Sequence, residues 1–337
     1  MTRPGAERPR TIAEALKIYK SLFSESAGGD VEARKANYTA VANNFYDLVT
    51  DFYQFGWGQS FHFAPRKRSE SLKASLARCE RGLGDILGLR PGMRVADIGC
   101  GVGGPLCTIG RHSGANVVGV NNNAYQVGKA QRLIAKFGLA DRCEVVKADF
   151  MNLPFPPGSF DAAYSMEATP HAPDKVAVFR QIFQVLKPGG CFAGYEWCLT
   201  PKYDAAKPEH QILKRGIELG NGLPELATCP DVVHALQAAG FEVIETHDAA
   251  AEGDPETPWY RALEGRDLTL TSLPRTPLGR SFTNAAVRGM EALRLAPSGT
   301  TEVSALLNTV ADQLVEAGTT GIFTPIFFFH ARRPHSS

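Results

Sequence analysis

A strand, a glycine-rich turn and a helix follow one another in the middle of this 337-residue chain, and this sequence limits the fold more than any other feature. Residues 94–98 read as a short apolar strand, and GCGVGG occupies positions 99–104. Glycines at such a turn let the backbone approach a bound molecule, and the N-terminus of the next helix favours a negatively charged group. The pattern predicts a nucleotide-cofactor loop in an α/β protein.

The residues around the turn distinguish two cofactor classes. Gly99, Gly101 and Gly104 also match the G-x-G-x-x-G pattern of dinucleotide sites, which place an acid about 20 residues further on. That place reads Asn121-Asn-Asn123, whereas an acid, Asp97, precedes the glycines. A carboxylate at the strand end suits the sulfonium and ammonium groups of S-adenosylmethionine. We therefore predict S-adenosylmethionine as the cofactor.

Further cofactor contacts are expected at the ends of the second and third strands. A carboxylate at 149 can accept a hydrogen bond from the adenine amino group while the ring at 150 covers its face. Amides at 121, 122 and 126 can bind the ribose and the amino-acid end. The predicted cofactor residues are Asp97, Gly99, Gly101, Gly103, Asn121, Asn122, Gln126, Asp149 and Phe150.

Strands and helices alternate from Pro91 onward, which predicts a doubly wound, Rossmann-like parallel sheet. Roughly 75 residues separate the last two expected strands, too many for a turn, so a helical insertion is expected over 255–318. The expected strands are 94–98, 116–120, 143–146, 160–164, 190–195, 241–245 and 321–330.

Three regions follow from this pattern. Residues 1–88 hold helical spacing and an aromatic segment, 89–250 hold the cofactor-binding core, and 251–337 hold the insertion and the last strand. The helix expected over 69–87 has Ser69 as its N-cap and Gly88 as its C-terminal cap.

The charge, the length of the apolar runs and the cysteine pattern of the chain exclude several classes of protein. With 36 basic and 35 acidic residues the net charge is +1, so no overall field recruits nucleic acid. The first dozen residues lack the apolar core of a secretory signal, and no apolar run approaches a membrane span. Seven cysteines without a Cys-x-x-Cys pair argue against a disulfide framework or a zinc site. We expect a cytoplasmic protein without a metal.

An aromatic stretch, YQFGWGQSFHF at 53–63, precedes the sheet. Gly56 and Gly58 interrupt it too often for a good helix, and the stretch as a whole is too irregular for an alternating strand. The stretch is therefore predicted to be a loop that folds over a ligand. Its rings belong to Tyr53, Phe55, Trp57, Phe61 and Phe63.

Four blocks of the chain resemble the sterol 24-C-methyltransferases, a family of class I S-adenosylmethionine-dependent methyltransferases. They are YQFGWGQSFHF (53–63), ADIGCGVGGP (96–105), YSMEATPHAPD (164–174) and IELGNGLP (217–224), and FTPIFFFHARRP (323–334) resembles the family's ending. The resemblance implies a hydrophobic sterol pocket beside the cofactor. It also implies methylation of the sterol side-chain double bond through a carbocation, followed by a hydride shift and loss of a proton.

This chemistry requires surfaces that stabilise a cation without attacking it, and one base. Aromatic faces attract a cation, which gives the aromatic stretch its expected role. His171 is the expected base, and Glu167, four residues earlier, would share its face if the stretch is helical and would orient it or balance the cation. Glu196 is a weaker acidic candidate. The predicted catalytic residues are Tyr53, Trp57, His62, Glu167, His171 and Glu218.

The chain departs from the family pattern at several positions. Gln54 stands where an acid is usual, Pro170 where cysteine is usual, and Ala124 where an acid is common, while Cys79 and Arg81 replace two histidines. Two alternatives therefore stay open: a methyltransferase acting on another isoprenoid or lipid, and a sterol-binding protein without catalysis.

The expected partner is a sterol substrate, and no nucleic acid. Because sterols reside in bilayers, a peripheral contact with a membrane also stays open. Trp259, Tyr260 and residues 268–273 in the insertion are the sequence features that favour it. No feature of the sequence sets the oligomeric state.

Overall fold

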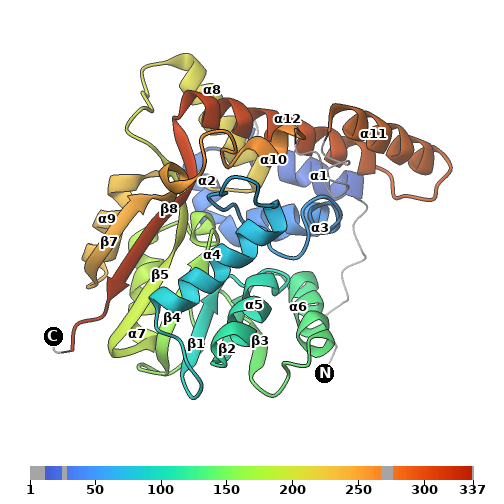
Figure 1. The fold of residues 1–337 in the computed structure, drawn as a ribbon. Helices are drawn as coiled ribbons and strands as arrows, with labels where there is room; N and C mark the ends of the chain where they lie inside the picture. The colour runs from blue at the N-terminus through green and yellow to red at the C-terminus, as the bar shows by residue number, and fades with distance from the viewer. Residues whose placement is uncertain (1–11, 25–28, 267–275, 336–337) are drawn as a thin grey trace, which may run out of the picture.

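The computed structural model describes residues 12–24, 29–266 and 276–335. Its centre is one mixed sheet in the order β3-β2-β1-β4-β5-β8-β7, with the short β6 paired to β5 (Figure 1). The strands are β1 (Arg94–Ile98), β2 (Asn116–Asn121), β3 (Cys143–Lys147), β4 (Phe160–Met166), β5 (Leu186–Leu199), β6 (Ala227–Thr228), β7 (Glu242–Asp248) and β8 (Phe323–Arg332).

Helices from the middle of the chain cover both faces of the sheet. One face carries α4 (Leu72–Ile86), α5 (Gly104–Ser113) and α6 (Ala124–Lys136), and the other carries α7 (Lys175–Val185) and α9 (Cys229–Ala238). Val95 and Val117 pack into the first core, whereas Ile98 and Val120 pack into the second. This division follows from the period of two along each strand. The predicted doubly wound, Rossmann-like α/β fold is confirmed.

One part of the fold prediction was wrong, because the sheet is not parallel throughout. Strand β8 runs antiparallel to both of its neighbours, β5 and β7. Leu199, at the carboxyl end of β5, pairs with Phe323, the first residue of β8. The preceding segment delivers the chain to the carboxyl edge of the sheet, so the last strand has to return in the opposite direction.

A second layer of helices lies over the carboxyl edge of the sheet (Figure 1). It joins both ends of the chain, since Tyr19 and Phe45 from the N-terminal part pack with Val303 from the C-terminal part. The described part of the expected insertion contains three helices, the last three of this layer, and residues 268–273, which the sequence singled out, lie outside the described ranges. The helices of this layer are α1 (Ile12–Ser21), α2 (Val31–Ala36), α3 (Tyr38–Gly56), α8 (Pro208–Asn221), α10 (Arg261–Glu264), α11 (Pro277–Ala292) and α12 (Thr300–Thr320).

The local predictions around the aromatic stretch need two corrections. Tyr53 to Gly56 form the last turn of α3, not a loop, because burial of the preceding helix outweighs the weak helix propensity of glycine. Ser71, not Ser69, caps α4, since its side chain accepts from Ala74 N at 3.2 Å. Gly88 takes the left-handed conformation after α4, with φ of 58°, as a C-terminal cap requires.

Three further observations concern disulfides, metal sites and membrane-spanning helices, which the sequence argued against. The seven cysteines are all free. Within the described ranges, no group of three or more His, Cys, Asp and Glu side chains is arranged to hold a metal ion. No helix among the described residues is long and apolar enough to cross a membrane.

Packing between α8 and α12 depends on a glycine. A Cβ atom at Gly220 would lie 1.9 Å from Cγ2 of Val310, so the two helices approach through this position. Gly220→Ala is expected to lower the free energy of unfolding by about 2 kcal/mol, measured by denaturant titration.

Gly82→Ala in α4 is the matched control, because nothing lies within 4 Å of a Cβ atom there. This substitution is expected to raise the free energy of unfolding by about 0.8 kcal/mol through helix propensity. Equal effects of the two substitutions would contradict the packing argument.

Candidate active site

The glycine turn is shaped for close approach on two sides. Gly99, Gly101 and Gly103 all have positive φ, at 79°, 53° and 88°. A Cβ atom at Gly99 would lie 2.1 Å from Cβ of Ala168, so the segment after β4 passes directly against the turn. At Gly101 nothing lies within 4 Å, and a side chain there would fill the adjoining pocket. The turn therefore requires glycine at Gly99 to avoid a clash with Ala168 and at Gly101 to keep the pocket empty of side chains.

This first pocket, the cofactor pocket, lies at the carboxyl ends of β1, β2 and β4. All the predicted cofactor residues line it except Gly103, which caps α5 and packs against Ala130. The predicted residues in the lining are Asp97, Gly99, Gly101, Asn121, Asn122, Gln126, Asp149 and Phe150.

Asp97 provides a buried acceptor in this pocket. Tyr164 donates a hydrogen bond to it at 3.0 Å, and no cationic side chain among the described residues forms an ion pair with it. Burial raises the pKa of Asp97 to about 7, against the lowering effect of the Tyr164 hydrogen bond. A ligand ammonium group would restore the charged form, so the residues present fit the amino-acid end of S-adenosylmethionine.

Side chains from α3 complete the cofactor pocket, and the sequence did not predict them. Tyr38 donates a hydrogen bond to Asp149, and Thr50 accepts one from Gln126 at 3.2 Å. Gln126 in turn accepts from Asn121 at 2.9 Å. The contacts of Tyr38 and Thr50 join residues 111 and 76 positions apart, so no local spacing in the sequence indicates them.

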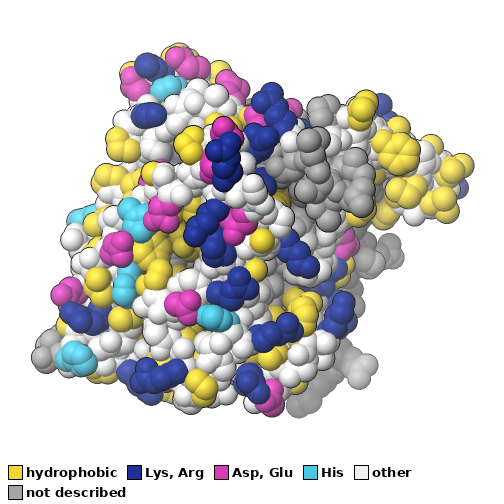
Figure 2. Space-filling model, viewed as in Figure 1, with side chains coloured by type: hydrophobic (Ala, Val, Ile, Leu, Met, Phe, Trp, Pro, Cys, Tyr) yellow, Lys and Arg dark blue, Asp and Glu magenta, His cyan; other side chains and the backbone are white. Residues whose placement is uncertain are grey.

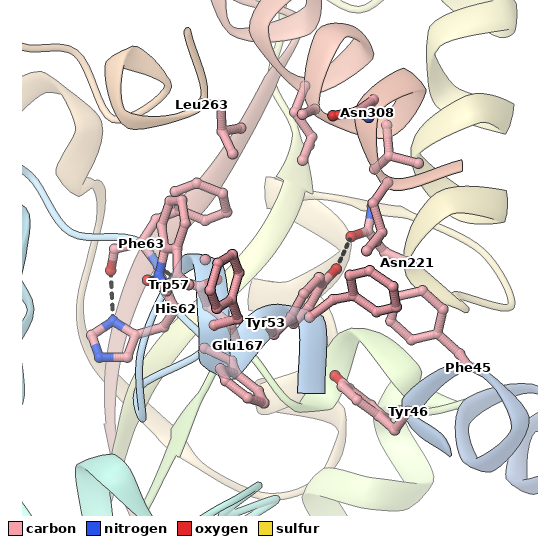
Figure 3. Close-up of a pocket in the computed structure, with 18 of the residues that line it drawn as sticks. Phe45, Tyr46, Tyr53, Trp57, His62, Phe63, Glu167, Asn221, Leu263 and Asn308 are labelled. Carbon is pink, nitrogen blue, oxygen red and sulfur yellow. Dashed lines mark hydrogen bonds between the residues drawn. The ribbon is translucent and has the colours of Figure 1, made fainter. Parts of the chain in front are cut away.

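The second pocket, the aromatic pocket, shares part of its lining with the first. Figure 3 shows the side chains that line this aromatic pocket. Trp57 and Phe63 meet with ring centroids 5.1 Å apart, and Tyr53 and Phe61 with centroids 5.4 Å apart, both edge to face. Phe55 lines the rim only, since 69% of it is exposed. Helices α8 and α12 close the other side of the pocket with residues that include Asn221, Asn308 and Leu314.

Five residues line both pockets and form their junction. Two molecules bound in the two pockets would therefore meet beside these side chains. The sequence predicted three of the five as catalytic candidates. The junction residues are Tyr46, Phe61, His62, Glu167 and His171.

Glu167 stands at the end of β4 in a left-handed conformation, with φ of 56°. Its carboxyl group accepts hydrogen bonds from Phe63 N and from Trp197 Nε1, both at 2.6 Å. Burial raises the pKa of Glu167 to about 8, opposed by the charge of His62 and by these two hydrogen bonds. A cation at the junction would favour its ionised form.

His62 is held as a cation beside this carboxyl group. Both ring nitrogens face oxygen acceptors: Nδ1 lies 2.7 Å from Phe63 O and Nε2 lies 3.1 Å from Oε1 of Glu80. Burial alone would lower the pKa of His62, but the hydrogen bond and charge of Glu80 raise it above its ordinary value. An imidazolium with both protons held in this way is a poor proton acceptor.

His171 is held in the opposite state. Its Nδ1 lies 3.0 Å from Gly222 O, which can only accept, so the proton sits on Nδ1. Nε2 therefore accepts from the hydroxyl of Tyr46 at 2.9 Å. Burial lowers the pKa of His171 to about 4, so the ring is neutral at pH 7.

The expected pairing of Glu167 with His171 was wrong. Only Thr169–His171 forms a short 3₁₀ turn, and each of the two side chains has its own partners. Tyr46 orients the histidine instead. Its one sequence signal is its position seven residues before Tyr53, two turns earlier on the same face of α3.

Two family models match this chain: the methyltransferase domain over residues 96–194 and the sterol methyltransferase C-terminal region over residues 270–335. The cycloartenol-C-24-methyltransferase of Arabidopsis thaliana is 48% identical over 307 residues, which cover 91% of each chain. This chain belongs to the sterol 24-C-methyltransferase family. The sterol 24-C-methyltransferase ERG6 of Saccharomyces cerevisiae is 43% identical over 332 residues, 96% of this chain and 86% of that protein.

Solved structures share the fold of this sterol methyltransferase family member at low sequence identity. The cyclopropane synthase MmaA2 from Mycobacterium tuberculosis has a TM-score of 0.68 at 16% identity and covers 87% of this chain and 98% of its own. The geranyl diphosphate C-methyltransferase from Streptomyces coelicolor A3(2) has a TM-score of 0.62 at 16% identity, with 88% and 97% covered. These likenesses show the class I methyltransferase fold.

The departure from the sterol methyltransferase pattern at Gln54 lies outside both pockets. Its side chain accepts from Lys129 and donates to Gln59 at 2.8 Å. The amide therefore leaves the lining of the pockets unchanged. Pro170, in contrast, lines the aromatic pocket and changes its surface.

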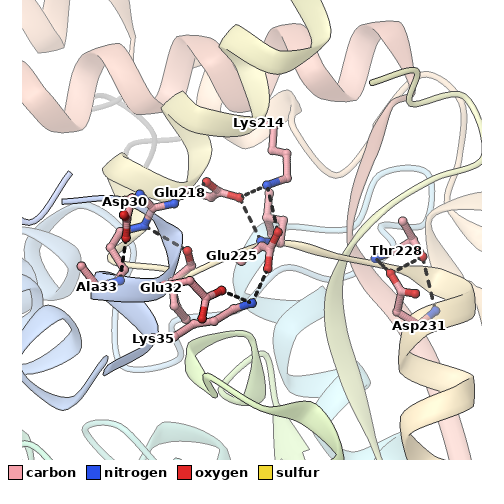
Figure 4. A network of polar contacts seen from close by, with 12 residues as sticks. Asp30, Glu32, Ala33, Lys35, Lys214, Glu218, Glu225, Thr228 and Asp231 are labelled. Carbon is pink, nitrogen blue, oxygen red and sulfur yellow. Dashed lines mark hydrogen bonds and ion pairs between the residues drawn. The ribbon is translucent and has the colours of Figure 1, made fainter. Parts of the chain in front are cut away.

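Two acidic residues that the sequence suggested as candidates for the site of this sterol methyltransferase form ion pairs between elements of the fold instead. Glu218 is buried and pairs with Lys214 at 2.5 Å and Arg34 at 3.3 Å, which joins α2 to α8 (Figure 4). It is absent from the lining of both pockets, and so is Glu196, which pairs with Lys175 at 3.0 Å. The structure thus does not bring Glu218 to the junction.

The charge of the buried His62–Glu80 pair contributes to stability. Since the folded-state pKa of His62 is raised, this contribution is present below about pH 6.5, the unfolded value, and is lost as pH rises through the folded value. Glu80→Gln is expected to lower the free energy of unfolding by about 3 kcal/mol at pH 6 and to flatten its dependence on pH.

Glu252→Gln is the matched control, because the pair between Glu252 and His247 at 2.5 Å is 58% and 34% exposed. It is expected to cost less than about 1 kcal/mol in the same denaturant titration. An equal loss of unfolding free energy in the two variants would show that the buried pair stabilises the protein no more than the exposed pair does.

Proposed function

We propose that this chain transfers a methyl group from S-adenosylmethionine to the side-chain double bond of a sterol. The observation that carries the proposal is the shared junction, where the cofactor pocket meets a pocket walled by aromatic rings. An apolar, elongated substrate suits those walls, and the chemistry occurs where the pockets meet. A dry pocket also excludes water, which would trap a carbocation.

Residues of the cofactor pocket have complementary roles in this proposal. Asp97 accepts from the ammonium group, Asn121 and Gln126 contact the ribose and the amino-acid end, and Asp149 accepts from the adenine amino group with Phe150 against its face. S-adenosylmethionine supplies an electrophilic methyl group on a positively charged sulfur. Gly101 leaves the space that its approach to the turn requires.

The aromatic rings and Glu167 stabilise positive charge on the sterol. When the π electrons of the alkene form the new bond to the methyl carbon, the methyl–sulfur bond would break and leave its electron pair on sulfur, with S-adenosylhomocysteine as the leaving group. The neighbouring carbon of the former alkene is then left as a cation. Faces such as those of Trp57 and Phe61 attract a cation by roughly 0.5–2 kcal/mol per ring when water is excluded. Glu167, held in place by Phe63 and Trp197, balances the charge from a fixed distance.

The Tyr46–His171 pair removes the final proton. After the hydride shift, the tyrosine oxygen takes a proton from the substrate carbon, and the C–H electron pair becomes the new double bond. At the same time the hydroxyl hydrogen of Tyr46 moves to Nε2 of His171. His171 then holds two protons, with Nδ1 still donating to Gly222 O. A base with a low pKa suffices, because a carbocation is a very strong acid.

A labelling assay tests the proposed reaction. Purified protein is incubated with methyl-labelled S-adenosylmethionine and with two sterols that differ only in the side-chain double bond. We expect label in the unsaturated sterol and none in the saturated one, since only an alkene can attack the methyl group. Label in a different isoprenoid or lipid, or sterol binding without transfer, would overturn the proposal in favour of the corresponding alternative.

Tyr46→Phe tests the proton acceptor. This variant removes the hydroxyl but keeps the ring, so we expect kcat to fall by about 10²-fold and the methylated products to shift toward other alkene isomers. Cofactor binding, measured by calorimetry, is expected to stay unchanged.

The matched control is Tyr125→Phe, whose hydroxyl contacts the exposed Asp51 at 2.9 Å away from both pockets. It is expected to keep both the rate and the product ratio of the unsubstituted protein. A Tyr46→Phe protein with a normal product ratio and normal kcat would exclude the pair as the base.

A further inference from the structure

Helix α11 and the residues after it carry an unusual surface. The helix extends from the body of the molecule (Figure 1), and hydrophobic side chains gather on its exposed side (Figure 2). Five of the twelve large hydrophobic side chains that are exposed on the described chain lie within this one segment. They are Leu278 (84% exposed), Phe282 (76%), Met290 (42%), Leu293 (71%) and Leu295 (75%).

The helix is amphipathic in the reverse of the usual sense. Besides the buried Val287, its inner side makes polar contacts with the rest of the molecule: Arg280 to Asp312 at 2.8 Å, and Asn284 to Ser304 at 2.7 Å. Glu291 accepts from two backbone N–H groups at the start of α12, both at 2.8 Å. A surface helix normally turns its apolar face to the core, so this apolar face is built for another environment.

Three of the apolar residues form one stripe. Leu278, Phe282 and Leu293 follow helical spacing of four and eleven residues, with Gly289 between them on the same side. The exposed charges of this segment are basic. Arg294 lies between Leu293 and Leu295, Arg288 lies at the flank of the stripe, and Glu291, the single acid between 277 and 296, is engaged by the start of α12.

We propose that this face, defined by Leu278, Phe282, Met290, Leu293 and Leu295, docks onto a lipid bilayer that contains anionic phospholipids. An amphipathic helix with an apolar face and basic residues lies in the plane of the interface, with its apolar side among the acyl chains. Arginine side chains reach from such a position to the headgroups. The proposal rests on the proposed sterol substrate and assigns the surface through which the protein meets it.

The location of the aromatic pocket supports a bilayer as the occupant. Arg280, Thr283 and Asn284, on the inner side of the same helix, line that pocket. A lipid substrate that leaves the bilayer at α11 therefore has to pass only this one helix to enter the aromatic pocket. Docking at this face would place the aromatic pocket next to the lipid bilayer, in which sterols reside.

A second copy of the chain fits this face less well. In a symmetric contact between two copies of this face, Arg294, which lies between Leu293 and Leu295, would be buried against apolar side chains, and the face offers no free acid to pair with it. An unpaired buried charge is strongly unfavourable. At a bilayer surface the same arginine stays solvated by headgroups and water.

Vesicle flotation tests the proposal directly. The protein is mixed with vesicles of phosphatidylcholine and phosphatidylserine without sterol, and the variant Leu278→Ser/Phe282→Ser is compared with Ile86→Ser/Ile212→Ser. The control removes two exposed apolar side chains from α4 and α8. We expect the control to float like the unsubstituted protein and the α11 variant to bind at least about tenfold more weakly. Thermal unfolding shows that both variants fold.

A turnover measurement separates this proposal from the proposed function. With sterol supplied in cyclodextrin, the α11 variant is expected to match the control, because neither altered side chain lines a pocket. With sterol supplied in the vesicles, the variant is expected to be about tenfold slower. Absence of turnover in every protein would defeat the proposed function but leave the flotation result to decide docking.

Two outcomes would overturn the docking surface. One is equal flotation of the α11 variant and the control. The other is a concentration-dependent dimer, seen by analytical ultracentrifugation, that the α11 variant loses while none of the proteins floats. The second result would assign the face to a copy of this chain.

Discussion

A hydrogen bond between residues 104 positions apart holds the site together. The backbone N–H of Phe63 donates to the carboxyl group of Glu167 at 2.6 Å, which fixes the aromatic segment over the end of β4. Trp197 binds the other carboxyl oxygen, and His62 supplies a positive charge beside it. These hydrogen bonds strengthen when Glu167 is ionised, because hydrogen bonds to a charged group are among the strongest in proteins. The close passage of Ala168 over Gly99 then sets how near the cofactor turn lies to this arrangement.

Burial shifts the pKa values of the titratable groups at the junction, and that of Asp97 in the adjoining cofactor pocket, in different directions. It raises the pKa of Glu167 to about 8 and that of Asp97 to about 7, and it lowers that of His171 to about 4. His62 alone stays cationic, because Glu80 compensates the desolvation. Without a ligand the junction therefore carries little net negative charge. A bound cation shifts both carboxyl groups toward their ionised forms, so the site becomes complementary to positive charge only when such charge is present.

Both ends of the chain build the substrate side. The cofactor side comes from the carboxyl ends of the sheet strands together with residues of α3, α6 and the segment after α3. Buried pairs such as Glu218 with Arg34 attach the N-terminal helices to α8. Helix α12 packs on α8 through Gly220 and carries α11 on polar contacts. The core therefore provides a methyl donor site that many enzymes share, and the added helices determine what reaches it. The amide at Gln54 fits this division, because it lies on the outside of both pockets.

Local patterns in the sequence determined the α/β fold, the glycine turn, the choice of S-adenosylmethionine and eight of the residues that line its pocket. These features depend on periodicity and on spacing within a few dozen residues, which one strand–turn–helix unit expresses by itself. Only the tertiary structure decided the antiparallel direction of β8, the continuation of α3 through Gly56, the pairing of His171 with Tyr46 rather than Glu167, and the architectural role of Glu218. Each of these depends on which distant segment packs alongside and what it desolvates, and spacing along the chain does not encode such contacts.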